Sequence, residues 1–259
     1  MKPIIFICNR LIKLCGHTSK MFGYLFHFIF PNKRFTIPKN SKAIIRTKNK
    51  GIIPKILWQT NFTNKVTLPV YLNYSFNRLL SPTYEYKFMG DIEIKDFVKC
   101  NFSQQIYKSF NKLNIGAAQA DFWRLLVLYK LGGIYLDIDA HLVWPLELIV
   151  QSKSKELFMV SKKNHFTNHF FAASKQNPIF KKAIDLIVKN IESEKKCDTI
   201  YDLTGPTILN QVIEDKKVNF RLSKYTCVQG SFTNEHFQYI DKSEGKWTHV
   251  KSENLLKNQ

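Results

Sequence analysis

A pair of glycines, Gly132 and Gly133, separates two apolar segments of different length. Residues 115–131 are apolar almost throughout and are long enough for a buried helix, which the pair would end at a cap with positive φ. Residues 134–136 are a short apolar run that predicts a strand. A buried helix that leads directly into a buried strand is typical of α/β folds, so this segment restricts the chain to that class.

Four charged side chains accompany the predicted helix and strand. Asp121 and Arg124 are three residues apart and share one helix face, in a sequence so apolar that charges there are paired or functional. Asp137 and Asp139 stand at the exit of the strand, and their carboxylates point the same way if the extended chain continues through Asp139. Ligands usually bind at strand ends, which makes these four residues the candidate active site. The alternative is that each Asp only caps a helix or forms a turn.

Predicted strands and helices alternate along the rest of the chain. The expected strands are 54–60, 84–88, 157–160 and 169–172, and the expected helices are 71–80, 101–113 and the segments that begin at 177 and 204. This alternation predicts an α/β sandwich with a mostly parallel sheet, forming one domain over residues 51–259. Residues 1–50 are expected to be a separate N-terminal segment that ends in a polar, basic linker from residue 32.

The basic charge is concentrated near the N-terminus. The formal net charge is +19, yet no Asp or Glu precedes Glu85, and the first 84 residues hold fourteen of the 39 Lys and Arg. Residues 21–30 form an aromatic, apolar run of about half the length that a membrane-spanning helix needs. The pattern predicts a segment that lies in the interface of an anionic membrane, with packing on the protein's own core as the alternative. Nucleic acid is not expected as a partner, because no recognised nucleic-acid-binding motif accompanies the charge.

The five cysteines are scattered and show no metal-binding or disulfide spacing, which is typical of reduced cytosolic thiols. Together with the N-terminal pattern, they predict a cytoplasmic protein that associates peripherally with the inner face of the cell membrane.

Paired carboxylates suit Mg²⁺ or Mn²⁺, which prefer oxygen ligands and often bind substrate phosphates. A divalent ion on a diphosphate neutralises the charge of a departing nucleotide, as the transfer of a sugar from a nucleoside diphosphate requires. Asp121 would accept hydrogen bonds from sugar hydroxyls, and Arg124 would pair with it or bind sugar or phosphate oxygens. Two other functions remain open: a metal-dependent phosphoryl transferase or nuclease with a basic nucleic-acid-binding arm, and a non-catalytic module that binds anionic lipid or polysaccharide.

These motifs together resemble the DXD-containing sugar-binding region of family 32 glycosyltransferases, which include yeast mannosyltransferases and bacterial capsule and lipopolysaccharide enzymes. The resemblance extends over about residues 52–210. It is carried by A-D-x-x-R at 120–124, L-G-G-I-Y-x-D-x-D at 131–139, I-P-K-I-L-W-Q-T at 53–60, P-T-Y-E-Y at 82–86 and T-G-P at 204–206. Trp58 stands where these enzymes more often have His.

The resemblance implies a GT-A-like, Rossmann-like fold that binds a nucleotide sugar. It also implies metal-dependent transfer of a hexose, with retention of anomeric configuration, from a UDP- or GDP-hexose to a saccharide or glycolipid acceptor in surface polysaccharide biosynthesis. By this likeness Asp139 is the direct metal ligand, and Asp137 contacts ribose or sugar and reaches the metal through water. Asp121 and Arg124 hold the donor sugar, so that Asp121, Arg124 and Asp137 form the catalytic set.

The resemblance places two further parts of the donor site outside this set. Trp58 would stack on the nucleobase, with Gln59 beside it, although a lone Trp in a predicted strand also fits core packing. Trp247 would belong to a C-terminal closing loop, but the Ser that usually accompanies it is missing here.

Overall fold

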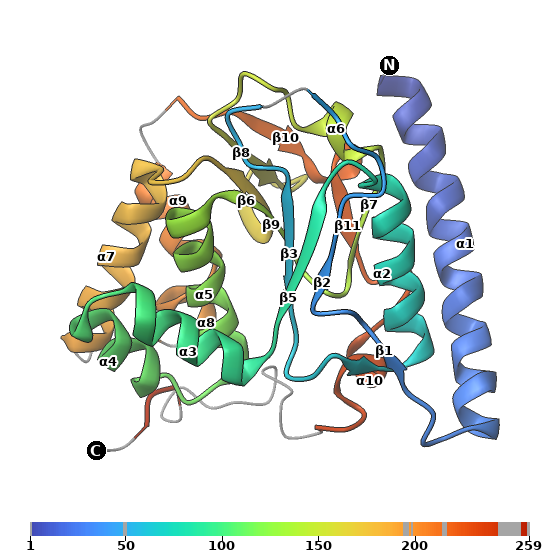
Figure 1. Cartoon of the computed structure of the whole chain (residues 1–259), viewed down its shortest axis with the longest axis horizontal. Helices are drawn as coiled ribbons and strands as arrows, with labels where there is room; N and C mark the ends of the chain where they lie inside the picture. Colours follow the sequence, from blue (N-terminus) through green and yellow to red (C-terminus); the bar gives the residue numbers. More distant parts are fainter. Residues whose placement is uncertain are drawn as a thin grey trace.

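The computed structural model describes residues 2–48, 51–193, 197, 199–213, 217–242 and 255–257. Its centre is a seven-stranded sheet in the order β10-β8-β9-β6-β3-β5-β2 (Figure 1). Five of these strands run in one direction: β3 (Ile56–Thr60), β5 (Glu85–Met89), β6 (Gly133–Leu136), β8 (Glu156–Val160) and β10 (Phe220–Leu222). β2 (Asn40–Ser41) and β9 (Phe166–Ala173) run in the opposite direction. The prediction of an α/β fold with a mostly parallel sheet is confirmed.

Helices cover both faces of this sheet (Figure 1). One face carries α3 (Asp91–Asn101), α4 (Gln104–Lys112), α5 (Gly116–Leu131), α7 (Pro178–Glu192), α8 (Ile200–Leu203) and α9 (Pro206–Ile213). On the other side lie α1 (Lys2–Ile29) and α2 (Leu68–Leu80). The shorter elements are β1 (Phe35–Thr36), β4 (Lys65–Val66), β7 (Ala140–Leu142), α6 (Leu146–Ile149), η1 (Ser223–Tyr225), β11 (Cys227–Gln229) and α10 (Glu235–Tyr239). The buried residues accordingly form two apolar clusters, one on each side.

The glycine pair lets helix α5 turn directly into strand β6. Gly132 and Gly133 have φ angles of +65° and +113°, which residues with a side chain rarely adopt. A Cβ atom on Gly133 would lie 2.7 Å from the carbonyl oxygen of Ile56 and 2.9 Å from the indole nitrogen of Trp58. Glycine is therefore required at this position so that β6 can pack closely beside β3. Asp137 and Asp139, which follow β6, then lie at the edge of the sheet where β3 also ends.

The N-terminal segment differs in two ways from the sequence expectation. All but the last residue of the run at 21–30 belongs to the end of a single 28-residue helix, α1, which packs along α2. Residues 32–48, expected to be a linker, contain β1 and β2, and β2 pairs with β5 at the edge of the main sheet. Within the described ranges, no helix combines the length and apolarity needed to cross a bilayer. The division into two units near residue 50 remains a prediction.

One buried histidine next to α1 should make stability depend on pH. His141 is fully buried, and neither ring nitrogen has a hydrogen-bond partner among the described residues. Burial, and then the nearby Lys13 and His17 of α1, lower the pKa of His141 to about 4. The unfolded chain, whose histidine pKa stays near 6.5, therefore binds the proton preferentially between these two values.

We expect the free energy of unfolding to fall as the pH drops from about 6.5 to about 4, with His141 contributing up to about 1.4 kcal/mol per pH unit. Urea unfolding of the wild type and of His141→Phe across this range measures the contribution. The replacement ring fits the aromatic surroundings formed by Phe76 and Phe232. An identical pH dependence in the variant would show that His141 is not responsible.

Candidate active site

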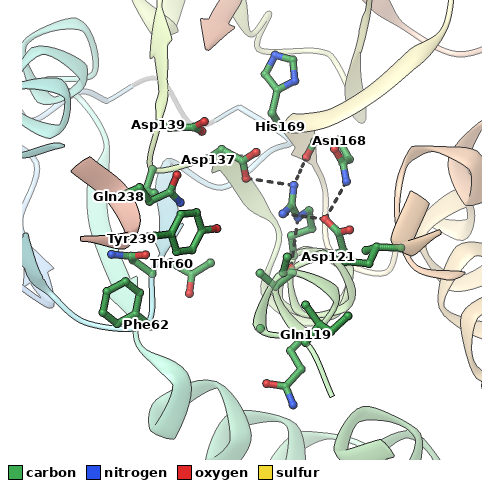
Figure 2. Close-up of a pocket in the computed structure, with 18 of the residues that line it drawn as sticks. Thr60, Phe62, Gln119, Asp121, Asp137, Asp139, Asn168, His169, Gln238 and Tyr239 are labelled. Carbon is green, nitrogen blue, oxygen red and sulfur yellow. Dashed lines mark hydrogen bonds and ion pairs between the residues drawn. The ribbon is translucent and has the colours of Figure 1, made fainter. Parts of the chain in front are cut away.

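A cavity of about 1190 Å³ lies at the edge of the sheet where β3 and β6 end and β9 begins. It brings together the four residues singled out from the sequence, because Asp121, Arg124, Asp137 and Asp139 all line it. Figure 2 shows Asp121, Asp137 and Asp139 around it. The helix α5 supplies the first pair, and the turn after β6 supplies the second. The geometry places the candidate catalytic set in one site.

Arg124 ties the two pairs of residues together. It is only 5% exposed, and its guanidinium forms ion pairs with Asp121 (Nη2 to Oδ1, 2.9 Å) and Asp137 (Nη1 to Oδ1, 3.1 Å). It also donates to the carbonyl oxygen of Asn168 at 2.5 Å and lies over the ring of Tyr135, 4.5 Å from its centre. A guanidinium held on this many sides acts as a fixed positive charge between the two carboxylates.

Asp121 is held by Arg124 of its own helix and by side chains from two other parts of the chain. Besides Arg124, it accepts a hydrogen bond from Asn168 Nδ2 at 2.8 Å and one from Thr204 Oγ1 at 3.5 Å. Thr204 belongs to the T-G-P turn, whose role in the site had no explanation in the sequence itself. His169, which follows Asn168 on β9, also lines the cavity, and burial lowers its pKa to about 4. The imidazole beside the carboxylates is therefore neutral.

Asp137 and Asp139 converge, but through a turn and not through the extended chain that we expected. Strand β6 ends at Leu136, and Ala140 N donates to the carbonyl oxygen of Asp137 to close the turn. The side chain of Gln229 shows the convergence, because its Nε2 lies 3.2 Å from Asp137 Oδ2 and 3.1 Å from Asp139 Oδ1. The two carboxylates thus present one oxygen each to a shared position.

Burial strongly affects the charge of these acids. Burial, and then the neighbouring Asp137, raise the pKa of Asp139 to about 7. Burial also raises the pKa of Asp121 to about 7, while Arg124 opposes the rise. The pKa of Arg124 is raised because the surrounding acids favour its charged form, although burial opposes this. A cation beside Asp139 would remove the electrostatic cost of its ionised form.

This arrangement fits a divalent metal ion. Asp137 uses Oδ1 to accept from Tyr135 OH at 2.6 Å and to pair with Arg124, which leaves Oδ2 beside Asp139 Oδ1. Two hard oxygens that already share one hydrogen-bond donor are suitable ligands for Mg²⁺ or Mn²⁺. Within the described ranges, no cluster of three or more His, Cys, Asp or Glu side chains could hold a metal ion. Further ligands would therefore be water and substrate phosphate, as is usual for Mg²⁺.

The structure does not place Trp58 in the cavity, which corrects the expectation that it stacks on a nucleobase. Trp58 is 1% exposed, packs edge-on against Trp123, and donates from its indole nitrogen to the carbonyl oxygen of Gly132 at 3.0 Å. The alternative of core packing is the one that the structure supports. Gln59 is also buried, and its Nε2 donates to the carbonyl oxygen of Asp137, so that it positions the turn instead of contacting a ligand.

Two aromatic side chains that line the cavity, Phe62 and Tyr239, come from positions that the sequence did not mark. Phe62 follows β3 by two residues, and Tyr239 ends α10. Figure 2 shows both on one side of Asp137, with Asp121 and Asn168 on the other. Gln229 is a further residue that sequence reasoning missed, since it lies about ninety positions after the acids that it binds. Trp247, predicted to close the site, lies outside the described residues.

Residues 54–156 match the family model described as the glycosyltransferase sugar-binding region containing a DXD motif. An uncharacterised glycosyltransferase of Acanthamoeba polyphaga mimivirus is 26% identical over 206 residues, which are 74% of this chain and 77% of the viral protein. The initiation-specific alpha-1,6-mannosyltransferase of Schizosaccharomyces pombe is 34% identical over 95 residues, which are 34% of this chain and 23% of the yeast protein.

The fold has a counterpart among solved structures. The PaToxG glycosyltransferase superposes with a TM-score of 0.54 at 20% identity, covering 78% of this chain and 79% of that one. At this identity the likeness concerns the fold alone. The family model and the names of the relatives confirm the resemblance to DXD glycosyltransferases, and the chain is a glycosyltransferase. This finding replaces the nuclease and the binding-module alternatives.

Proposed function

We propose that this glycosyltransferase transfers a hexose from a nucleoside-diphosphate sugar to a saccharide or glycolipid, with a divalent metal ion held at Asp137 and Asp139. The observation that carries the proposal is the convergence of these two carboxylates at the end of β6, beside the buried Asp121–Arg124 pair. A sugar diphosphate needs a site for the phosphate charge and a site for the sugar hydroxyls. The two pairs of residues provide them side by side.

The cavity offers a separate place for each part of the donor. Phe62 and Tyr239 provide aromatic surface on one side of the carboxylates, which suits a nucleobase (Figure 2). Asp121 on the other side accepts hydrogen bonds, which suits sugar hydroxyls. We assign the diphosphate to the space between them, next to Asp137 and Asp139. In this arrangement Phe62 replaces Trp58 as the residue proposed to stack on the base.

The protein's own residues would hold the donor and position the groups that meet its charged phosphates. The bound metal ion would act as a Lewis acid that neutralises the charge of the departing nucleoside diphosphate. Arg124 pairs with Asp121 and with Asp137 and holds both carboxylates in place, so that hydroxyl and ribose contacts form without rearrangement of the site. Gln229 orients the two carboxylate oxygens toward the same position. We further propose Mn²⁺ or Mg²⁺ as the metal and either UDP or GDP as the nucleotide.

Retention of the anomeric configuration, and a role in capsule or lipopolysaccharide synthesis at the inner face of the cell membrane, also belong to this proposal. Both rest on the resemblance of the A-D-x-x-R and DXD motifs to those of family 32 enzymes. Proton NMR of the released or transferred sugar distinguishes retention from inversion by the configuration of the first-formed anomer.

The proposal is tested by incubating the purified protein with a panel of UDP- and GDP-hexoses, with and without Mn²⁺. We expect slow hydrolysis of one donor, because a glycosyltransferase without its acceptor transfers sugar to water. Hydrolysis should stop when the metal is removed with a chelator and return when Mn²⁺ is added in excess. Hydrolysis that does not depend on metal would argue against the proposal. So would a melting temperature of the protein that no donor raises in the presence of Mn²⁺.

Substitution of the proposed base-stacking residue should weaken donor binding. For Phe62→Ala we expect the KM for the donor to rise by about tenfold or more while kcat changes little, because a stacked base contributes about 1–3 kcal/mol. Phe28→Ala, which removes an exposed ring on α1, is the matched control and should leave KM unchanged. An unchanged KM in Phe62→Ala would show that the base binds elsewhere in the cavity.

A further inference from the structure

Helix α1 has its apolar side turned away from the protein. Its buried positions are Ile5, Asn9, Gly16, Gly23 and His27. Their spacing of four or seven residues puts them on one stripe of the helix, and after Ile5 every residue of that stripe is glycine or polar. The stripe is held by specific contacts: Asn9 Nδ2 donates to the carbonyl oxygen of Lys224 at 2.7 Å, and Leu68 N donates to His27 Nε2 at 3.0 Å. An ordinary surface helix shows the reverse pattern, with its apolar side inward.

The outward side of α1 carries most of the exposed apolar side chains of this helix. Nine exposed side chains form it, which we call the outer face: Ile4, Ile7, Leu11, Leu14, Met21, Phe22, Leu25, Phe28 and Ile29. Eleven of the 22 large apolar side chains exposed in the described part of the chain belong to this one helix. Figure 1 shows α1 at the margin of the molecule, alongside α2 and with its other side uncovered. An apolar surface of this extent indicates a contact with something other than water.

The charges beside the outer face indicate what that contact is. Lys2, Arg10, Lys13 and Lys20 lie on one flank of the helix, given 100° of rotation per residue. Lys2 and Arg10 are exposed there, whereas Lys13 and Lys20 are half-buried between the outer face and the protein. No Asp or Glu occurs on α1 or anywhere before Glu85. A symmetric pairing of two α1 helices would bring these basic flanks together without a carboxylate from either helix to compensate. An anionic lipid surface compensates them, at about 1 kcal/mol for each basic residue near it.

We propose that the outer face of α1 docks on an anionic lipid bilayer, with the helix in the plane of the interface and still packed against α2. Glycines that face the protein and apolar side chains that face outward are the arrangement found in helices that contact lipid. The two glycines permit close packing, since a Cβ on Gly23 would lie 2.3 Å from the ring of Pro69. The whole helix, and not only residues 21–30, therefore forms the docking surface.

The docking surface adjoins the candidate active site. Lys20 Nζ donates to the carbonyl oxygen of Gly230 at 2.8 Å, and Asn234 Nδ2 donates to Tyr24 OH at 2.7 Å. Gly230 and Asn234 both line the cavity. A bilayer on the outer face would therefore lie beside one wall of the cavity. If the enzyme has the function proposed above, this placement favours a lipid-linked saccharide as the acceptor.

Vesicle sedimentation with the full chain tests the docking. We expect the protein to bind phosphatidylcholine vesicles that contain phosphatidylglycerol more strongly than vesicles of pure phosphatidylcholine. High salt should weaken binding to both kinds of vesicle. The double substitution Leu25→Asp/Phe28→Asp should weaken binding by about tenfold or more, because two apolar side chains no longer enter the interface. Ile92→Asp/Leu148→Asp is the matched control, since these residues are similarly exposed (76% and 56%, against 56% and 85% for Leu25 and Phe28) but belong to α3 and α6.

Donor hydrolysis without vesicles separates this inference from the proposed function. Both double variants should keep the wild-type rate, because neither alters a residue that lines the cavity. Equal vesicle binding by the two double variants, or no binding by the wild type, would overturn the docking proposal. Light scattering adds a further outcome: a dimer that Leu25→Asp/Phe28→Asp converts to a monomer, with vesicle binding unchanged, would assign the outer face to a second copy of the chain.

Discussion

Asp139→Asn should reduce the metal-dependent hydrolysis of the donor by about 10³-fold, equivalent to about 4 kcal/mol of transition-state stabilisation. The amide keeps the shape of the side chain. Its oxygen can still accept the hydrogen bond that Gln229 Nε2 donates to Asp139 Oδ1 at 3.1 Å in the wild type. It removes the charge that the metal requires. The loss should therefore appear in kcat and in the affinity for Mn²⁺, measured by calorimetry, and not in the affinity for a metal-free nucleoside.

The stability of the same variant distinguishes a lost ligand from a damaged fold. Burial and the neighbouring Asp137 raise the pKa of Asp139, so the ionised carboxylate destabilises the metal-free protein. Asp139→Asn should thus melt at the same temperature as the wild type or higher when no metal is present. Asp96→Asn, on the exposed side of α3, is the control that should keep full activity. Full activity in Asp139→Asn would contradict the assignment of the metal site.

Arg124→Met should lower the free energy of unfolding by about 3–5 kcal/mol at pH 8 or so, because it leaves the buried Asp121 and the half-buried Asp137 without their counter-charge. Urea unfolding monitored by tryptophan fluorescence measures the loss. The pKa of Asp121, already raised to about 7, should rise further in the variant. Since a raised carboxyl pKa costs stability only where the group is ionised in the unfolded chain, the deficit should shrink as the pH falls toward about 4.

A double-mutant cycle shows whether the deficit comes from the uncompensated acid. Asp121→Asn/Arg124→Met should recover part of the stability lost by Arg124→Met, because one of the two buried charges is then absent. Arg46→Met, which removes an exposed arginine, serves as the control and should change stability little. An equal loss in the single and the double variant would show that packing of the long side chain matters more than its charge.

The part of the site that lies within one segment could be predicted from the sequence. Asp121 and Arg124 share a helix face because of their spacing, and the glycine pair marks the end of α5. These features are local, so spacing and backbone preference determine them. The convergence of Asp137 and Asp139 was also predicted, but its cause was wrong. The chain turns after β6, and a turn of this kind gives no period that distinguishes it from a continuing strand.

The parts of the site that depend on distant segments could not be predicted in this way. Thr204 and Gln229 reach Asp121, Asp137 and Asp139 across more than eighty residues of sequence. Trp58 shows a second limit. β3 is buried on both faces, so alternation along the strand could not tell whether its indole meets the cavity or the core. The contact with the backbone of the glycine pair decides the matter, and that contact exists only after β3 and β6 have paired.

The helix α1 escaped sequence reasoning for a different reason. The side of α1 that faces the protein is mostly glycine and polar residues, whereas its apolar side faces outward. An amphipathic pattern is usually taken to mean that the apolar side is buried, which here gives the wrong orientation. Only the run at 21–30 was apolar enough to predict an interfacial segment. The rest of the helix was divided into short apolar clusters.

The contacts of α1 with the cavity wall have a practical consequence for anyone who prepares this enzyme. An exposed apolar helix at the start of a chain invites deletion to obtain a well-behaved sample. Here the deletion would also remove Lys20 and Tyr24, which hold Gly230 and Asn234, and would uncover Phe237 of α10. An inactive shortened protein would then be misread as evidence against the catalytic residues. Polar replacements on the outer face, with the inward stripe kept intact, give solubility without dismantling the wall of the active site.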